Sequence, residues 1–203
     1  EARARIAARE FKPDEYSSFS FTDYSRSFEK QNIELGESVI DEQGHATFAM
    51  ETPAGLMPPS SLGAAVTVTV LDEGGRAVSA QLTLPLHPYP FYVGVKKSVE
   101  GYAEPGRESE FEAVALDREG KPLTGRALEA ELFRVTWNTN LQRDERGFYR
   151  YVSERREESV EKRSLLSGAA PVKFLFTPKD MGSYRLVLRG VEGGASADVN
   201  FYA

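Results

Sequence analysis

Serine and lysine stand three residues apart at two places in the chain, a spacing that can pair a nucleophile with its base. The two copies are Ser27 to Lys30 and Ser159 to Lys162. On a helix, this spacing places the hydroxyl and the amine on adjacent turns. Neither copy lies in a helical pattern, and the Ser-Asp-Asn and Lys-Thr-Gly motifs that accompany such pairs are missing. We therefore interpret both copies as chance occurrences.

Other residues that carry catalysis are scarce. The 203 residues include no cysteine, which excludes a thiol nucleophile, an iron–sulfur cluster and a disulfide framework. The two histidines, His45 and His87, lie in different elements and have no obvious shared acid. A Gly-x-Ser-x-Gly motif, a phosphate-binding loop and a dinucleotide fingerprint are also missing from the sequence. The sequence predicts a protein that is not an enzyme and that uses no cofactor or metal.

The form Asp-x-x-Gly occurs at residues 41–44, 72–75, 117–120 and 144–147. Aspartate accepts hydrogen bonds within its own turn, and glycine readily takes positive φ, so this form is typical of turns at strand ends. Calcium binding needs several oxygen ligands that converge in one loop, and each of these turns supplies two or three at most. We favour turns over calcium sites.

The charge is unevenly spread along the chain. The net charge is −6, with 7 basic and 13 acidic side chains in residues 1–90 and 18 of each in residues 91–203. Neither part has the basic excess that attracts a phosphate backbone, so we expect no nucleic-acid partner. No apolar run has the ~18 residues of a membrane span, and no signal peptide is visible. The first residue is Glu, which is consistent with a piece of a longer protein.

Apolar and polar residues alternate along most of the chain. Val66, Val68 and Val70 alternate with threonines, and residues 78–86 resume the pattern after the turn at 72–75. The same period of two recurs in residues 2–8, 128–132, 172–176, 184–188 and 195–201. Short alternating strands separated by turns predict an all-β fold of two tandem antiparallel β-sandwich domains, similar to fibronectin or immunoglobulin domains.

A proline-rich stretch predicts the boundary between the two domains. Two prolines within three residues interrupt strand pairing and stiffen a connection. We therefore predict one domain at residues 1–88 and another at residues 89–203. The junction residues that set the angle between them are expected to be Pro88, Tyr89, Pro90 and Phe91.

The segment from Gln142 to Arg163 holds 7 basic and 6 acidic residues. One interpretation is a long exposed hairpin whose charges discourage aggregation of the sheet edge. The other is an exposed loop that trypsin-like proteases cut. The candidate cleavage residues are Arg143, Arg146, Arg155, Arg156, Lys162 and Arg163.

Trp137 stands among several aromatic residues that suggest a binding platform. Alternation places Phe133, Val135 and Trp137 on one face of a strand. We favour packing of Trp137 in the core or between the domains over a role in binding.

The order of these elements resembles the macroglobulin domains of bacterial alpha-2-macroglobulins. The resemblance covers nearly the whole chain, and the order and spacing of its motifs are more specific than any single one. The residues that carry it are 40–44, 70–76, 92–95, 102–106, 116–122, 132–137 and 174–186.

The resemblance implies two consecutive macroglobulin domains placed just ahead of a bait-region domain. Members of the family trap proteases by collapsing after bait cleavage, and some also bond to the protease through a Cys-x-Glu-Gln thioester. Since the chain has no cysteine, it contains neither that site nor the lipid-anchor cysteine. The resemblance implies an architectural role in a periplasmic, membrane-anchored lipoprotein that inhibits a broad range of proteases. The implied partners are other domains of the chain, target proteases through the full-length protein, and cell-wall synthesis or envelope proteins.

A second hypothesis is an immunoglobulin-like pair of domains for adhesion or for binding carbohydrate or a partner at the cell envelope. Such a module should carry exposed aromatic residues spaced along one face. Trp137 alone is thin support for it.

Overall fold

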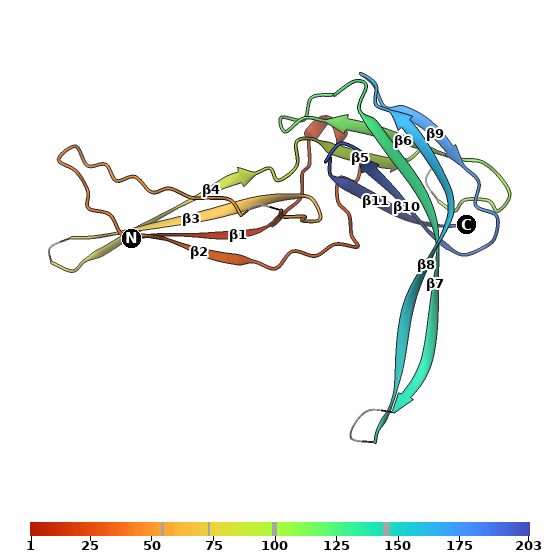
Figure 1. Ribbon diagram of the computed structural model, residues 1–203, viewed down its shortest axis with the longest axis horizontal. Helices are drawn as coiled ribbons and strands as arrows, with labels where there is room; N and C mark the ends of the chain where they lie inside the picture. The colour runs from red at the N-terminus through yellow and green to blue at the C-terminus, as the bar shows by residue number, and fades with distance from the viewer. Residues whose placement is uncertain (54, 73, 99–100, 144–146) are drawn as a thin grey trace.

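The computed structural model describes residues 1–53, 55–72, 74–98, 101–143 and 147–203. Three antiparallel sheets account for the strands in these residues, and they form two halves that join near residue 90 (Figure 1). The described helical content is one 3-10 turn, η1, at Asp14–Tyr16. Within the described part of the chain, no helix is long and apolar enough to cross a membrane.

The first half contains one four-stranded sheet. Its strands, in spatial order, are β2 (Gln31–Gly36), β1 (Ala2–Arg9), β3 (Ser61–Leu71) and β4 (Ala77–Leu86). Alternation along β1 buries Ala2, Ala4 and Ile6 and exposes the arginines between them. Ile6 packs with Leu62 and Ala64 of β3, and these three buried residues form the small core of this half.

The second half is a sandwich of two sheets. The three-stranded sheet has the order β5 (Tyr92–Lys97), β6 (Ser109–Leu116), β9 (Val172–Phe176). The four-stranded sheet has the order β11 (Ser196–Tyr202), β10 (Ser183–Gly190), β7 (Ala127–Arg143), β8 (Tyr149–Leu166). Inward side chains of both sheets form the largest core of the molecule, which includes Phe111, Leu132, Phe176 and Leu186.

The predicted all-β, antiparallel fold is confirmed, and the hairpin expected at residues 66–86 is the β3–β4 pair. One feature of the first half differs from a pair of stacked sheets. Its second layer consists of irregular segments, from which Phe28, Met50 and Leu56 pack on the core. The segment at 37–60 contains Pro53, Pro58 and Pro59 and lacks sustained alternation, and its described residues, 37–53 and 55–60, form no strand ladder.

The Asp-x-x-Gly turns form as expected where the structure describes them. The Oδ1 atom of Asp117 accepts hydrogen bonds from the N–H groups of Glu119 and Lys121, at 3.0 and 2.8 Å. Gly120 completes the turn with a φ of 85°. Residue 73 of the second turn and residues 144–146 of the fourth lie outside the described residues.

β7 and β8 continue beyond the sandwich as a two-stranded ribbon (Figure 1). This extension overturns the prediction that Trp137 packs in the core or between domains. Val135 is 8% exposed, whereas Trp137, two residues further along the same face of β7, is 63% exposed. The alternation is correct, but the strand has already passed the edge of the sandwich at Trp137, and the opposite sheet no longer covers that face.

Candidate functional site: the contact between the halves

Residues 10–26, which follow β1, leave the first sheet and lie against the sandwich of the second half. Ser20 and Val95 exchange two backbone hydrogen bonds, at 2.9 and 3.0 Å, so this segment pairs with β5. The N–H of Asp198 in β11 also donates to the carbonyl of Thr22 at 3.0 Å. The two halves are thus joined at a second place, far in sequence from the predicted junction.

Aromatic side chains fill the contact beneath this segment. Phe11 stacks on Tyr92, with ring centroids 4.1 Å apart and planes 12° from parallel. Phe21 lies directly over Gly94 of β5, where an added Cβ atom would come within 2.5 Å of the ring. Further buried members of this cluster are Phe19, Tyr89, Val114, Leu116 and Ala195. Gly94 is therefore needed because of the close approach of a ring from the other half.

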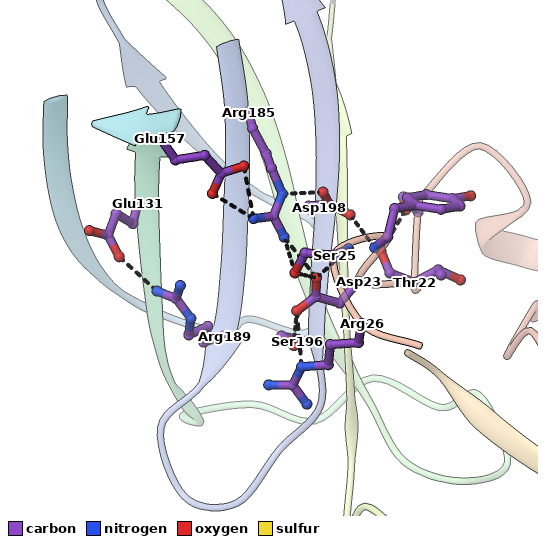
Figure 2. Close-up of polar contacts among 12 residues, drawn as sticks. Thr22, Asp23, Ser25, Arg26, Glu131, Glu157, Arg185, Arg189, Ser196 and Asp198 are labelled. Carbon is purple, nitrogen blue, oxygen red and sulfur yellow. Dashed lines mark hydrogen bonds and ion pairs between the residues drawn. The ribbon is translucent and has the colours of Figure 1, made fainter. Parts of the chain in front are cut away.

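A buried arginine lies at the centre of the polar part of the contact (Figure 2). Arg185 of β10 is 4% exposed and forms ion pairs with three carboxylates. Its Nη2 lies 2.7 Å from Asp23 and its Nη1 lies 3.1 Å from Glu157, while its Nε donates to Asp198. Asp23 belongs to the first half, and the other two carboxylates belong to β8 and β11. One guanidinium therefore ties three separate segments together.

Further hydrogen bonds complete the surroundings of Asp23. Ser196 donates to Oδ2 at 2.6 Å, and Ser25 donates to Oδ1 at 2.6 Å. Nε of Arg26 lies 3.2 Å from Oδ2. Asp198, which is 1% exposed, accepts in turn from the backbone N–H of Tyr24 at 2.8 Å. Among the described residues, every buried side-chain nitrogen and oxygen has a hydrogen-bond partner.

The charges of this network are balanced. Arg185, Arg26 and Arg155 supply three positive charges, and Asp23, Asp198 and Glu157 supply three negative charges. We call these six residues the Arg185 network. Moving each charge out of water costs several kcal/mol, and this cost is offset only by close ion pairs and further hydrogen bonds. The network has both. The arrangement fixes the relative orientation of the segments that carry these residues.

The protonation states of the network favour the ion pairs. Burial by itself raises the pKa of the Asp23 carboxyl, but hydrogen bonds from Ser196 and Ser25, together with the Arg185 charge, hold that pKa below its usual value. Burial likewise disfavours the charged form of Arg185, but Asp198, Glu157 and Asp23 outweigh it and raise the pKa of the guanidinium. Both groups therefore stay charged at neutral pH.

Two of the four predicted junction residues anchor the connection between the halves. The hydroxyl of Tyr89 donates to the carbonyl of Pro58 at 2.6 Å and accepts from Arg26 at 3.0 Å. Phe91 is 2% exposed and packs against the backbone at Gly190 and Gly194. Pro88 is half-buried and Pro90 is exposed. That these residues set the angle between two domains stays a prediction.

The residues proposed as protease-sensitive lie mostly in strand rather than in loop. Arg155, Arg156, Lys162 and Arg163 belong to β8 and are paired with β7, and Arg143 is the last residue of β7. Arg146 lies outside the described residues. Protease sensitivity of this segment stays a prediction.

Sequence reasoning missed the residues of the Arg185 network. Asp23 and Arg185 are 162 positions apart, so no local motif joins them. The available signal was one of composition: arginine and aspartate interrupt the apolar strands at Tyr184-Arg185-Leu186 and Ala197-Asp198-Val199. Arginines also interrupt β1, where Arg3 and Arg5 are exposed, so this signal does not distinguish a buried ion pair from a charge that faces solvent.

Comparison with known families accounts for both parts of the chain. Residues 1–88 match the model described as the bacterial alpha-2-macroglobulin MG5 domain, and residues 94–203 match bacterial macroglobulin domain 6. An alpha-2-macroglobulin of Xylella fastidiosa (strain 9a5c) is 25% identical over 187 residues, which span 91% of this chain and 11% of that protein. An alpha-2-macroglobulin homolog of Yersinia pestis is 25% identical over 201 residues, which span 93% of this chain and 10% of that protein.

Solved structures show the same fold. The methylamine-reacted alpha-2-macroglobulin of Salmonella aligns with a TM-score of 0.69 at 16% identity, over 100% of this chain and 14% of that one. The elastase-activated Escherichia coli protein aligns with a TM-score of 0.68 at 18% identity, over 100% of this chain and 18% of that one. The chain spans about a tenth of the length of the curated relatives it matches. Since the two family models cover nearly all of it, the chain belongs to the bacterial alpha-2-macroglobulin family.

Proposed function

We propose that the chain is a structural part of a bacterial protease trap, in which it holds two macroglobulin domains in a fixed relative position. The observation that carries this proposal is the contact between the halves, where a balanced, buried ion network and an aromatic cluster join segments from both. The family supports the trapping role, and the two family models, which match residues 1–88 and 94–203, support the proposal of one domain at residues 1–88 and another at 89–203. A rigid pair of domains transmits a rotation as one body.

The experiment compares the full-length parent with chain 1–203 in the presence of trypsin. Enclosure of the protease predicts that the full-length protein blocks cleavage of a large protein substrate but leaves cleavage of a small peptide substrate nearly unchanged. Chain 1–203 should inhibit neither reaction, since it encloses nothing. Stoichiometric inhibition by chain 1–203, or unhindered digestion of the large substrate beside the full-length protein, would contradict the proposal.

The remaining parts of the proposal concern the parent protein. We propose that its partners are its own further domains and target proteases, with envelope proteins as additional ones, and that it is a periplasmic lipoprotein without enzymatic activity. Fractionation of cells that express the parent, with and without globomycin to block lipoprotein processing, tests the location. The relatives and structures described above are alpha-2-macroglobulins, which does not favour the adhesion or carbohydrate-binding alternative.

A further inference from the structure

The outer part of the β7–β8 ribbon, residues 137–143 and 149–155, has two unlike faces. Trp137 stands opposite Arg155, Leu141 opposite Tyr151, and Arg143 opposite Tyr149. Side chains of directly opposed residues lie on the same side of an antiparallel pair, and alternation along each strand keeps the whole set on one side. We call this side the aromatic face. The opposite side carries Asn138, Asn140, Gln142, Arg150, Val152 and Glu154.

The aromatic face is open to solvent in the described part of the chain. Trp137 is 63% exposed, Leu141 54%, Tyr149 68% and Tyr151 78%. Single exposed apolar residues are ordinary, but four large ones on the same face of one element form a patch. This face also carries Thr139 and Ser153, whose hydroxyls lie 2.8 Å apart. The informative feature is that all four large exposed residues lie on this face, whereas a ribbon that served only as a solvated hairpin would not need them on one side.

The chemistry of the aromatic face matches a protein partner. Tryptophan, tyrosine and arginine are the residue types that anchor protein–protein contacts. The Arg143 guanidinium lies 5.9 Å from the Tyr149 ring centroid and donates to the carbonyl of Gly147 at 3.1 Å. The described positions of this face between residues 137 and 155 include Arg143 and Arg155 and no carboxylate, and Arg155 is already paired with Glu157 at 2.6 Å. A complementary surface is therefore apolar and carries an acidic side chain opposite Arg143.

We propose that the aromatic face docks on another domain of the parent chain, against an apolar surface that carries an acidic side chain opposite Arg143. About nine tenths of the length of the curated relatives lies outside the segment that this chain matches. A domain tethered on the same chain meets the ribbon at a high effective concentration, so a modest patch suffices for stable docking. This inference shares one premise with the proposed function, namely that the chain is part of a longer parent protein.

A second copy of the chain is a poorer occupant. A second copy offers the same face, whose described positions hold no carboxylate that could pair with Arg143, and like charges opposed across an interface are costly. The four large residues of the aromatic face are 54–78% exposed, so the ribbon offers a surface to a protein rather than a pocket to a small ligand.

Hydroxyl-radical footprinting with mass spectrometry tests the docking. Trp137 is the one tryptophan of the chain, and its oxidation is measured in chain 1–203 and in the full-length parent. The buried Tyr184, 1% exposed, serves as the internal control for folding in both samples. We expect oxidation of Trp137 and Tyr151 to fall severalfold in the parent. Equal oxidation in the two samples overturns the proposal, as does protection in chain 1–203 that grows with its concentration.

Matched variants of the full-length parent separate docking from a general effect on folding. Trp137→Ser with Tyr151→Ser removes two anchors of the aromatic face, so Tyr149 should become severalfold more reactive. Asn138→Ser with Asn140→Ser alters the opposite face of the ribbon, on β7, and should leave Tyr149 protected. Docking through the aromatic face is contradicted if Tyr149 stays protected in the Trp137/Tyr151 double variant. It is also contradicted if both double variants lose the protection of Tyr149 equally while Tyr184 stays protected.

The two proposals can fail separately. If the full-length parent protects Trp137 but does not block digestion of the large substrate, the docking stands and the trapping role fails. If it traps the protease while Trp137 remains as reactive as in chain 1–203, the trapping role stands and the docking fails.

Discussion

At the scale of single residues, Arg185 holds the two halves together. Its guanidinium is 4% exposed and meets carboxylates from three segments, of which Asp23 comes from the other half. Replacing both members of a buried pair with apolar residues can be neutral, but removing only one leaves a charge buried without its partner. The importance of Arg185 is therefore tested by removing it alone.

Arg185→Met is expected to lower the free energy of unfolding by about 3–5 kcal/mol, because Asp198 stays buried without its counter-charge and Asp23 keeps only that of Arg26. Urea denaturation of chain 1–203 measures the change. The matched control is Arg134→Met, which removes an exposed ion pair with Asp180 at 2.9 Å and should cost less than about 1 kcal/mol. Equal losses for the two variants would contradict the role assigned to Arg185.

Acid should weaken the contribution of Asp23 to the stability of the folded protein. Its pKa is lowered in the folded protein, where burial opposes ionisation but the serine hydrogen bonds and Arg185 outweigh burial. A lowered pKa adds stability above the unfolded-state value of about 3.9, and this stability is lost as pH falls through the folded pKa. The difference in unfolding free energy between the wild type and Asp23→Asn should therefore be largest at neutral pH and shrink below about pH 4. A difference that is constant over the acidic range would contradict this linkage.

At the scale of elements, the segment at residues 10–26 depends on close contact with β5. Phe21 covers Gly94, and Ser20 pairs with Val95 beside it. The ribbon is the opposite case: β7 and β8 hold each other by backbone hydrogen bonds over residues that the sandwich no longer covers. Residues 10–26 are therefore positioned by packing against the second half, whereas the ribbon is held by the hydrogen bonds between its own two strands.

Gly94→Ala is expected to destabilise chain 1–203 by about 1–3 kcal/mol, because the new methyl group would lie 2.5–2.6 Å from the Phe21 ring and 2.9 Å from Val114. Gly63→Ala is the control, since its nearest neighbour, the Arg9 side chain, is 3.6 Å away. Thermal unfolding compares the two variants, and adding Phe21→Leu should recover part of the loss at Gly94. Similar melting temperatures for the two alanine variants would contradict the close contact.

Brief trypsin treatment of chain 1–203 should cut after Arg143 before it cuts after Arg155, Arg156, Lys162 or Arg163. Arg143 ends β7, whereas the other four lie within β8, where cleavage requires the ladder to open first. Mass spectrometry of early fragments measures the order. Cleavage within β8 first would contradict it, and a ribbon that resists while the termini are trimmed would refute the protease-sensitive segment altogether.

At the scale of the whole molecule, the two halves are connected twice. The chain passes between them at residues 87–91, and residues 10–26 return to the second half through the aromatic cluster and the Arg185 network. Figure 1 shows that the first sheet and the ribbon extend away from the sandwich in different directions. Such a shape presents separate surfaces, and we expect the angle between the halves to depend on both connections.

Replacing Pro88 and Pro90 with glycine is expected to widen the range of angles between the halves, because the covalent connection loses its stiffness. Adding Arg185→Met should widen it further, because the second connection is then weakened as well. Small-angle X-ray scattering of chain 1–203 measures both effects. Pro105→Gly, in an exposed loop within the second half, is the control and should not alter the profile. Superimposable profiles for all variants would contradict the role of the junction.

Local pattern was enough to predict most of the strands and the turns, although β2 and β6 were not predicted. A period of two places Ala2, Ala4 and Ile6 on one face, and the Asp-x-x-Gly form places a turn after residue 116, because both effects involve residues within a few positions of each other. The family could also be recognised at this level, since the order of strands and turns along the chain carries the resemblance.

The sequence by itself therefore determined the all-β class, most strands and the family. Only the tertiary structure decided that Asp23 meets Arg185, that Phe21 covers Gly94 and that Trp137 stands in solvent. Alternation states which side of a strand a residue faces, but it does not state what lies on that side. Phe21 and Gly94 are 73 positions apart and Asp23 and Arg185 are 162 apart, and such segments come together only when the sheets pack.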